Sequence, residues 1–478
     1  MRVAWFSPLP PVRSGIAAYS AELLPRLGSE FDVDCYGAPP SLGRWGPTPS
    51  AVGSGLPLTR RTALGAVAVV ERGPRALFDA HDFVWKQQRA PYDLTVYQLG
   101  NAPCHDYMWA YLARYPGLVV LHDARLHHAR ARRLLNQRRF DDYRHEFWYD
   151  HPGATADVVE YAVEGLGGSI NYFWPMLRVV MRTARAIAVH NGRVAGELGE
   201  QYGDVPIDVI RMGVASLDGA RGTPLDGTVA ARAHVRRELA LPDDAVLFAT
   251  FGKITAEKRV APMLRALGTL ATEGIDAFLL LVGDAAEYPT LASEIQQYGI
   301  AGRVRVAGYV GVEAIGAYLA AADACLCLRW PTALETSASW LRCLAAARAT
   351  VITDLAHLAD IPTIDPSQRG PLPSDPAPIA IRVDLLDEDE SLRRAMWRLA
   401  TDARLRDDLA QAGHAYWSRE HTLDMMAADY RRVMQAAAAR PAPVAANLPA
   451  HFTNDHAEPA RQIARQFGVD VDILRSDL

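Results

Sequence analysis

The fold class is decided by the stretch Val246-Leu-Phe-Ala-Thr-Phe251-Gly252-Lys253-Ile-Thr-Ala-Glu257-Lys258-Arg259. Its first part is an apolar run that stops at a glycine, which predicts a buried strand over 246–251. Apolar residues then recur at helical spacing through 261–272, so a strand, a loop and a helix follow one another. Repeated units of this kind are typical of a parallel sheet with helical crossovers.

The same alternation continues outward from this unit through both halves of the chain. A stretch from about 213 to 232 holds several glycines and no periodicity, and it separates two sets of strands as a linker would. We therefore expect an α/β protein with two doubly wound parallel sheets. The predicted strands are 2–6, 31–36, 94–97, 118–121 and 186–189 in the first half, and 246–251, 278–282, 303–306, 324–328 and 350–353 in the second.

These strands lead to a division of the chain into five segments. We predict a first domain over 1–215, a linker over 216–234 and a second domain over 235–412. Helices over 413–437 are expected to pack back on the first domain, and the tail over 438–478 receives no role.

Composition points to an ordinary globular protein. Half of the 478 residues are apolar and 22% are charged, which excludes a disordered chain. The net charge of -5 gives no reason to expect nucleic-acid or general membrane binding. No apolar run approaches the roughly 18 residues that span a bilayer, and the first residues lack the pattern of a secretory signal. Together with five scattered cysteines, these features lead us to expect a cytoplasmic protein with reduced thiols.

Ligands of open parallel sheets bind beyond the carboxyl ends of the strands. The loop after the first strand reaches Gly15 at the start of a helix, where main-chain amides are open to a ligand. No G-x-G-x-x-G follows any predicted strand, which argues against a nicotinamide dehydrogenase. In the second half, Lys253, Lys258 and Arg259 lie between a strand and a helix and form a cationic site of phosphate size. The chain has only three lysines, so two of them within five residues focus attention on this loop.

Further strand ends in the second half carry the groups that a nucleotide diphosphate sugar requires. Glycines admit a planar base, a carboxylate suits sugar hydroxyls, and hydroxyl residues at the start of a helix suit an anion. The residues concerned are Gly283 and Asp284, Gly308, Tyr309 and Val310, the segment 329–337 with Glu335, Thr336 and Ser337, and Thr353 with Asp354.

These residues resemble the retaining glycosyltransferases of family 4, the glycosyl transferases group 1, which have the GT-B fold of two Rossmann-like domains facing across a cleft. The resemblance covers about 1–435 and is strongest over 245–362. It implies that the donor diphosphate binds to Gly252, Lys253 and Lys258 and to the backbone around Ser337 and Ala338. It also implies that Glu335 contacts the transferred sugar, and that Gly308, Tyr309 and Val310 lie against the nucleobase.

The sequence departs from this family at two positions. The family usually has a second glutamate eight positions after the first, where it binds the ribose hydroxyls; here that position is Cys343, preceded by Arg342. Arg348 stands where the family has a glycine. Ribose recognition, and with it the identity of the nucleotide, is therefore left open.

The first half supplies the other wall of the expected cleft. His122 and Asp123 follow one strand, and Asn101 and His105 follow another. A histidine just after a strand is often a hydrogen-bonded structural residue, but the resemblance implies that His122 lies near the sugar, with Asp123 available to orient it. Asn101, His105 and Asp123 are the acceptor-side candidates, with a structural role as the alternative for His105.

The segment Arg125–Arg144 holds seven arginines and the pair His127-His128. One interpretation is a solvated helix face whose arginines pair with Asp141, Asp142 and Glu146. The other is a docking surface for an anionic acceptor, such as a lipid phosphate on the inner membrane face.

The expected activity is transfer of a sugar from a nucleotide diphosphate sugar to a hydroxyl acceptor with retention of configuration, in the synthesis of envelope or other glycans. Lys253, Lys258 and helix dipoles would neutralise the leaving diphosphate, so we expect neither metal nor cofactor. Closure of the two domains would exclude water. Two alternatives stay open: a GT-B epimerase or phosphorylase, and a non-catalytic scaffold that binds a nucleotide or a glycan.

Overall fold

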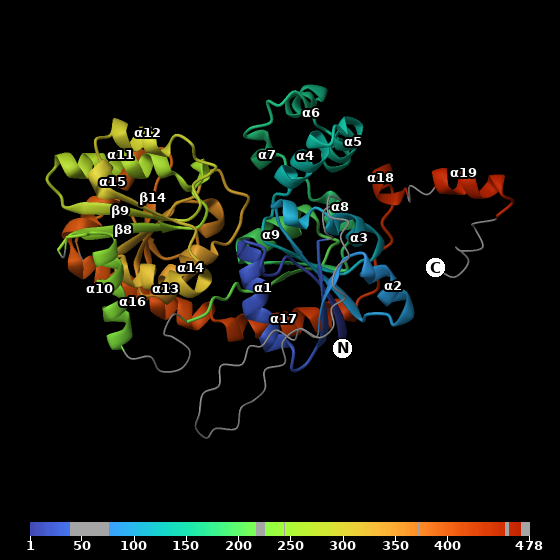
Figure 1. Ribbon diagram of the computed structural model, residues 1–478, viewed down its shortest axis with the longest axis horizontal. Helices are drawn as coiled ribbons and strands as arrows, with labels where there is room; N and C mark the ends of the chain where they lie inside the picture. Colours follow the sequence, from blue (N-terminus) through green and yellow to red (C-terminus); the bar gives the residue numbers. More distant parts are fainter. Residues whose placement is uncertain (39–75, 217–224, 243, 371, 455–457, 470–478) are drawn as a thin grey trace, which may run out of the picture.

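The computed structural model describes residues 1–38, 76–216, 225–242, 244–370, 372–454 and 458–469. Within these residues the chain forms two seven-stranded sheets whose strands are all parallel. The two sheets and their helices stand side by side in Figure 1, with the N-terminal half on the right. The predicted α/β class with two doubly wound sheets is confirmed.

The sheet of the N-terminal half has the strand order β3-β2-β1-β4-β5-β6-β7. Its central strands are buried along their whole length because helices cover both faces. The strands are β1 (Arg2–Phe6), β2 (Asp32–Gly37), β3 (Ala76–Asp79), β4 (Leu94–Leu99), β5 (Leu118–Leu121), β6 (Ala186–Val189) and β7 (Ile207–Val209). The helices of this half are α1 (Gly15–Leu27), α2 (Asp82–Arg89), α3 (Met108–Arg114), α4 (His127–Asn136), α5 (Phe140–Asp150), α6 (Ala156–Val163), α7 (Ile170–Phe173), α8 (Arg178–Thr183) and α9 (Gly192–Gln201).

The sheet of the C-terminal half has the order β10-β9-β8-β11-β12-β14-β13. Its strands are β8 (Val246–Phe251), β9 (Ala277–Val282), β10 (Val304–Gly308), β11 (Ala324–Cys327), β12 (Ala349–Thr353), β13 (Thr363–Ile364) and β14 (Ala380–Val383). The helices are α10 (Leu225–Glu238), α11 (Val260–Thr272), α12 (Leu291–Gln297), α13 (Val312–Ala321), α14 (Ala338–Ala345), α15 (Glu388–Thr401), α16 (Ala403–Glu420), α17 (Leu423–Ala438), α18 (Ala450–Thr453) and α19 (Glu458–Gln466).

Every strand predicted from the sequence is present, whereas β3, β7, β13 and β14 were not predicted. These four are short edge or near-edge strands whose apolar runs are too brief to stand out from loops.

Two of the predicted segment limits differ from the structure. Of the predicted linker, 217–224 lies outside the described residues, and 225–234 belongs to helix α10, so the linker was drawn too long. The limit between 412 and 413 falls inside α16, a continuous helix of 18 residues. Both limits were misplaced because the residues on either side of them are similar in polarity, so the sequence does not mark a boundary inside either helix.

Helices α16 and α17 carry the chain from the C-terminal half back to the N-terminal half. The hydroxyl of Tyr19 in α1 donates to that of Tyr430 in α17, at 2.7 Å. Leu23 of α1, Leu341 of α14 and Met426 of α17 belong to one apolar cluster, so a shared core joins the two halves.

Helices α4 to α8 form a helical module between β5 and β6, and Figure 1 shows its outer helices rising beyond the sheet. The module has an apolar core of its own, with Leu134, Tyr143 and Phe147. Its arginines pair with acidic neighbours: Arg130 with Glu146, Arg132 with Asp106, Arg139 with Asp142, and Arg144 with Asp141 and Glu160. These ion pairs favour the internally paired interpretation of Arg125–Arg144, although the pair of Arg130 and Glu146 is buried and not solvated.

The tail is anchored on the N-terminal half by α18. Phe452 is buried against Trp109, and His451 Nε2 lies 2.6 Å from Glu146 Oε1. Helix α19 follows at the end of the described tail, and Ile463 on it is exposed. No helix in the described parts of the chain combines the length and apolarity needed to cross a membrane.

Candidate functional site

A cavity of about 760 Å³ opens between the two halves, at the carboxyl ends of strands from both sheets. The predicted candidates that line it are Asn101 and Asp123 from the N-terminal half, and Gly252, Lys253, Lys258, Glu335, Thr336, Ser337 and Ala338 from the C-terminal half. The residues predicted for the diphosphate and the transferred sugar therefore meet part of the predicted acceptor wall in one place, whereas those predicted for the nucleobase do not line the cavity.

The two lysines of the loop after β8 have different surroundings. Lys253 is more than half exposed and forms an ion pair with Glu287. Lys258 is partly buried, and its Nζ donates to Phe251 O at 2.6 Å. Burial, followed by the nearby positive charge of Arg329, lowers the pKa of Lys258 to about 8.

Lys258 is a cation in the cavity wall, and among the described residues no carboxylate forms an ion pair with it, although Glu335 is near enough to act on its charge. Gly252 makes room for it: with φ of 97°, Gly252 has a conformation that a side chain disfavours, and a Cβ there would lie 3.3 Å from Lys258 Nζ. An anion of the size of a phosphate is the ligand that such a group binds.

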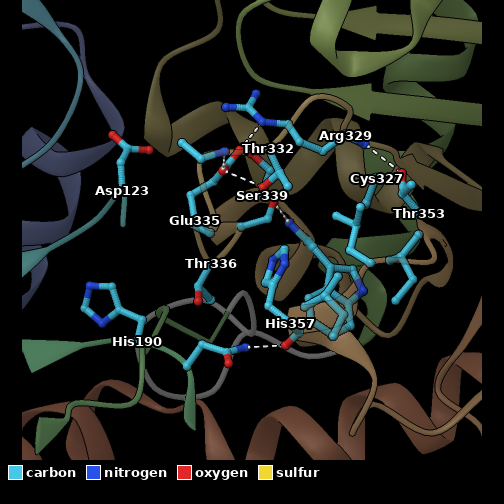
Figure 2. A pocket seen from close by; sticks show the side chains of 18 of the residues that line it. Asp123, His190, Cys327, Arg329, Thr332, Glu335, Thr336, Ser339, Thr353 and His357 are labelled. Carbon is cyan, nitrogen blue, oxygen red and sulfur yellow. Dashed lines mark hydrogen bonds and ion pairs between the residues drawn. The ribbon is translucent and has the colours of Figure 1, made fainter. Parts of the chain in front are cut away.

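The loop between β11 and α14 fixes the Glu335 carboxylate at the cavity wall. Glu335 Oε2 accepts from Thr332 Oγ1 at 2.9 Å and from the main-chain N–H of Ala333 at 2.8 Å, and Oε1 pairs with Arg329 (Figure 2). Leu334 has a φ of 61°, a left-handed conformation that non-glycine residues adopt at a cost, as is common at functional sites. The result is a preoriented acceptor for the hydroxyl groups of a ligand.

Helix α14 begins at the same wall. Ser337 is its N-cap and accepts from Trp340 N at 3.2 Å, while Thr336, Ser337, Ala338 and Ser339 line the cavity. Ser339 Oγ lies 3.5 Å from the position of a Cβ at Gly252, so the helix start adjoins the Lys258 site. The free amides and the dipole of a helix N-terminus add positive potential there.

The residues at the positions that depart from the family pattern make structural contacts. Cys343 is buried, with its Sγ 3.8 Å from Cys327 Sγ, and is not part of the cavity wall. Arg342 pairs with Glu22 of α1 at 2.6 Å. Arg348 donates to the carbonyls of Ala346 and Ala322. At position 343, where the family has a ribose-binding glutamate, this chain thus has a core residue.

His122 lies behind the cavity wall. It is buried, its Nε2 is 2.8 Å from Gln98 Oε1, and its Nδ1 is 3.3 Å from His190 Nε2. Burial, followed by the charge of His190, lowers the pKa of His122, so the ring is neutral. Because Gln98 and His190 take both ring nitrogens, Asp123 does not orient His122 as the sequence suggested.

The remaining candidates lie outside the cavity. Gly15 starts α1 and is exposed, and Gly283 packs against the Gly252 carbonyl, where a Cβ would be only 2.0 Å from the oxygen. Tyr309 stacks under the Arg13 guanidinium at 4.5 Å, near Gly308 and the partly buried Val310. His105 is buried with Nδ1 2.8 Å from Gln98 O, which favours the structural alternative for this residue.

Several residues of the cavity were missed by sequence reasoning. His190 follows β6 directly and His357 follows β12 closely, so the rule used for the other strand ends would have found them. Tyr172 reaches the cavity from α7, which only the tertiary fold shows.

Direct contacts join the two halves around this cavity. Ala124 N donates to Ala333 O at 2.9 Å, and Asn191 Nδ2 donates to His357 O at 2.9 Å. Arg193 forms a bidentate pair with Asp360, at 2.7 and 2.5 Å. The halves are thus closed on each other, which suits chemistry that must exclude water.

Metal ligands do not gather in this site. Among the described residues, no group of three or more His, Cys, Asp or Glu side chains is arranged to hold a metal ion.

Comparison with known proteins supports the same fold. Residues 231–334 match the family described as glycosyl transferases group 1. No curated protein matches the chain by sequence.

Solved structures match nearly the whole chain. HepE of Anabaena, solved in complex with UDP and glucose, has a TM-score of 0.58 at 13% identity, over 91% of this chain and 100% of that one. The sucrose-phosphate synthase of Thermosynechococcus elongatus gives 0.58 at 14% identity, over 91% and 100%. WaaG, a glycosyltransferase involved in lipopolysaccharide biosynthesis, gives 0.55 at 13% identity, over 90% and 99%. At such identity the likeness shows the fold, which is GT-B.

Proposed function

We propose that the chain is a glycosyltransferase that moves a sugar from a nucleotide diphosphate to a hydroxyl acceptor, with retention of configuration, in the synthesis of an envelope or other glycan. The observation that carries this proposal is the Lys258 ammonium, which has no carboxylate partner among the described residues and faces a cavity at the start of α14. The match of 231–334 to the glycosyl transferases group 1 and the GT-B fold support it.

The charges of the site suit the departure of a diphosphate. When the bond between the anomeric carbon and the phosphate oxygen breaks, negative charge collects on the diphosphate. Lys258 and the amides at Ser337 and Ala338 stand ready to stabilise that charge without a metal ion. Glu335, fixed by Thr332 and Ala333, would bind hydroxyls of the transferred sugar.

The first test is thermal unfolding of the protein with UDP, GDP, ADP, CDP and dTDP, with and without Mg²⁺. A ligand at 100 times its Kd stabilises the native state by about 2.7 kcal/mol, which is easily seen as a raised Tm. We expect one diphosphate to raise the Tm independently of Mg²⁺, and Lys258→Met to abolish the effect. Lys86→Met is the matched control, because Lys86 lies on α2 and is not part of the cavity wall, and it should leave the effect unchanged.

A Tm that no diphosphate changes would contradict the proposal and favour a scaffold. With the donor known, the anomeric configuration of the product by NMR tests retention. Sugar conversion without an acceptor would indicate an epimerase, and a requirement for free phosphate would indicate a phosphorylase.

A further inference from the structure

The wall opposite Glu335 contains a carboxylate, Asp123, whose position suggests a role in binding the acceptor. Asp123 follows β5 and lines the cavity, and Figure 2 shows its carboxylate directed across the cavity toward the side of Glu335 and Arg329. The next residue, Ala124, donates its N–H to Ala333 O, so this wall touches the loop that holds Glu335. Asp123 therefore lies next to the place where the transferred sugar would meet its acceptor.

Asn101 orients the Asp123 carboxylate. Its main-chain N–H donates to Oδ2 at 2.7 Å, and a hydrogen bond from its side chain also favours the charged form of the carboxylate. Asn101 is itself fixed, because its side chain donates to Arg125 O at 2.8 Å and accepts from Ala129 N at 3.2 Å. A Cβ on Gly100 would lie 3.1 Å from Oδ2, so a glycine permits this close approach.

The surroundings make Asp123 a base matched to neutral pH. Burial, followed by the negative charge of Glu335, raises its pKa to about 6, against the opposing effects of Asn101 and Arg329. His105 Nε2 lies 3.6 Å from the position of a Cβ on Gly100, and burial lowers the pKa of His105 to about 4, so its ring is neutral. Asp123 is thus ionised at pH 7, yet able to receive a proton.

Two rings from the helical module line the same cavity. Tyr172 and His128 stand edge to face with centroids 5.7 Å apart, and the Tyr172 hydroxyl lies 3.5 Å from Glu257 Oε1 of the C-terminal half. The two rings are inclined at 66°, so they form an aromatic corner beside the polar carboxylate. Such a corner suits a sugar ring, which offers an apolar face and hydroxyl edges.

We infer that Asp123 is the group that binds the acceptor hydroxyl, and that the acceptor is itself a sugar whose ring packs on Tyr172 and His128. The inference rests on the proposed transferase function. Asp123 Oδ1 accepts the hydrogen bond of the acceptor O–H. To keep the configuration, the acceptor oxygen bonds to the anomeric carbon on the same face of the sugar from which the diphosphate departs. The bond from that carbon to the diphosphate oxygen breaks, and its electron pair leaves with the diphosphate. The acceptor proton passes to Asp123 and from there to solvent.

The test compares Asp123→Asn with Asp123→Glu and with Asp141→Asn, an exposed carboxylate of the module, as the matched control. Nucleotide release is followed from UDP-, GDP-, ADP-, CDP- and dTDP-hexoses, with water, glycerol or methyl glucosides as acceptors. We expect Asp123→Asn to lose at least about a hundredfold in kcat/KM with every acceptor, water included. The Kd of the diphosphate should change less than twofold, because Asp123 is not part of the donor side.

The pH profile separates proton transfer from a structural role. Wild-type kcat/KM should fall as the pH drops through about 6, because Asp123 is then protonated. Asp123→Glu should keep this acid limb and Asp123→Asn should lose it. Tyr172→Ala should raise KM for methyl glucosides but not for glycerol.

The outcomes distinguish this inference from the proposed function. If Asp123→Asn turns over as fast as the wild type and its kcat/KM falls at low pH in the same way, the role of Asp123 is overturned but the transferase function is not. An equal effect of Tyr172→Ala on glycerol and methyl glucosides overturns the sugar acceptor. Absence of diphosphate binding and of nucleotide release in the wild type overturns the transferase function and this inference with it.

Discussion

At the scale of single residues, Lys258 connects the fold to the binding of an anion. Its pKa of about 8 means that the ammonium is partly deprotonated just above neutrality. The neutral amine attracts a diphosphate far less than the ammonium does. Binding should therefore be strong below pH 8 and weaken as the pH rises through 8, by about tenfold per pH unit at the limit where only the ammonium binds.

Isothermal titration calorimetry of the diphosphate between pH 6.5 and 9.5, in two buffers of different ionisation enthalpy, checks this expectation. Near pH 8 the protein should take up protons on binding, because the ligand stabilises the ammonium and raises the pKa of Lys258. A Kd that stays constant from pH 7 to 9.5 would show that Lys258 does not carry the interaction. Lys258→Met should remove the pH dependence, and Lys253→Met should retain it.

The same two lysines show what sequence can and cannot resolve at this scale. Their spacing after a strand identified the cationic loop, because βα loops collect at one edge of a parallel sheet. Their separate roles depend on tertiary neighbours. Lys253 forms an exposed ion pair with Glu287, whereas Lys258 donates a hydrogen bond to Phe251 O and so lies in the cavity wall. His122 gives the same lesson, since its place behind the cavity depends on His190, which is distant in sequence.

At the scale of elements, the start of α14 serves stability and binding at once, and substitutions at Ser337 should separate the two. Ser337→Ala removes the cap that accepts from Trp340 N and should cost about 1 kcal/mol of stability. Ser337→Asp keeps a capping oxygen and favours the helix dipole, so stability should be preserved. Its carboxylate, however, would occupy the place proposed for the diphosphate and repel it.

Urea unfolding and nucleotide titration of the two variants check this expectation. Ser337→Ala should unfold at lower urea while binding the diphosphate more weakly but measurably. Ser337→Asp should unfold like the wild type and fail to bind. Undiminished binding by Ser337→Asp would place the diphosphate elsewhere than the start of α14.

At the scale of the whole molecule, strands were easier to predict than the relation between the halves. Strands such as β4 and β9 are rich in apolar residues because they are buried along their whole length, and such runs are visible in one sequence. The return of α17 onto α1 was expected in outline, but its contacts join residues hundreds of positions apart, such as Tyr19 and Tyr430. For the same reason Tyr172, which the module brings to the cavity, carried no signal in the sequence.

Closure of the two halves yields the last prediction, because one of the ion pairs that join them is exposed at the rim of the cavity, unlike the more buried pair of Arg342 and Glu22. Arg193 and Asp360 form the charged pair at the rim, beside the uncharged contact from Asn191 to His357 O. Arg193→Asp or Asp360→Arg alone would place like charges together and favour an open cleft. The exchanged double variant restores the pairing with reversed orientation and should close again.

Small-angle scattering and kinetics on the four proteins provide the measurement. Each single variant should show a larger radius of gyration and a lower kcat/KM, and the exchange should restore both. The Kd of the diphosphate should stay near the wild-type value in all of them, since Lys258 and Ser337 lie within one half and need no closure to bind it. The loss of kcat/KM in the single variants should also become smaller at high salt, because salt screens exposed charges. If the single variants remain compact and fully active, closure is governed instead by the shared core around Leu341 and Met426.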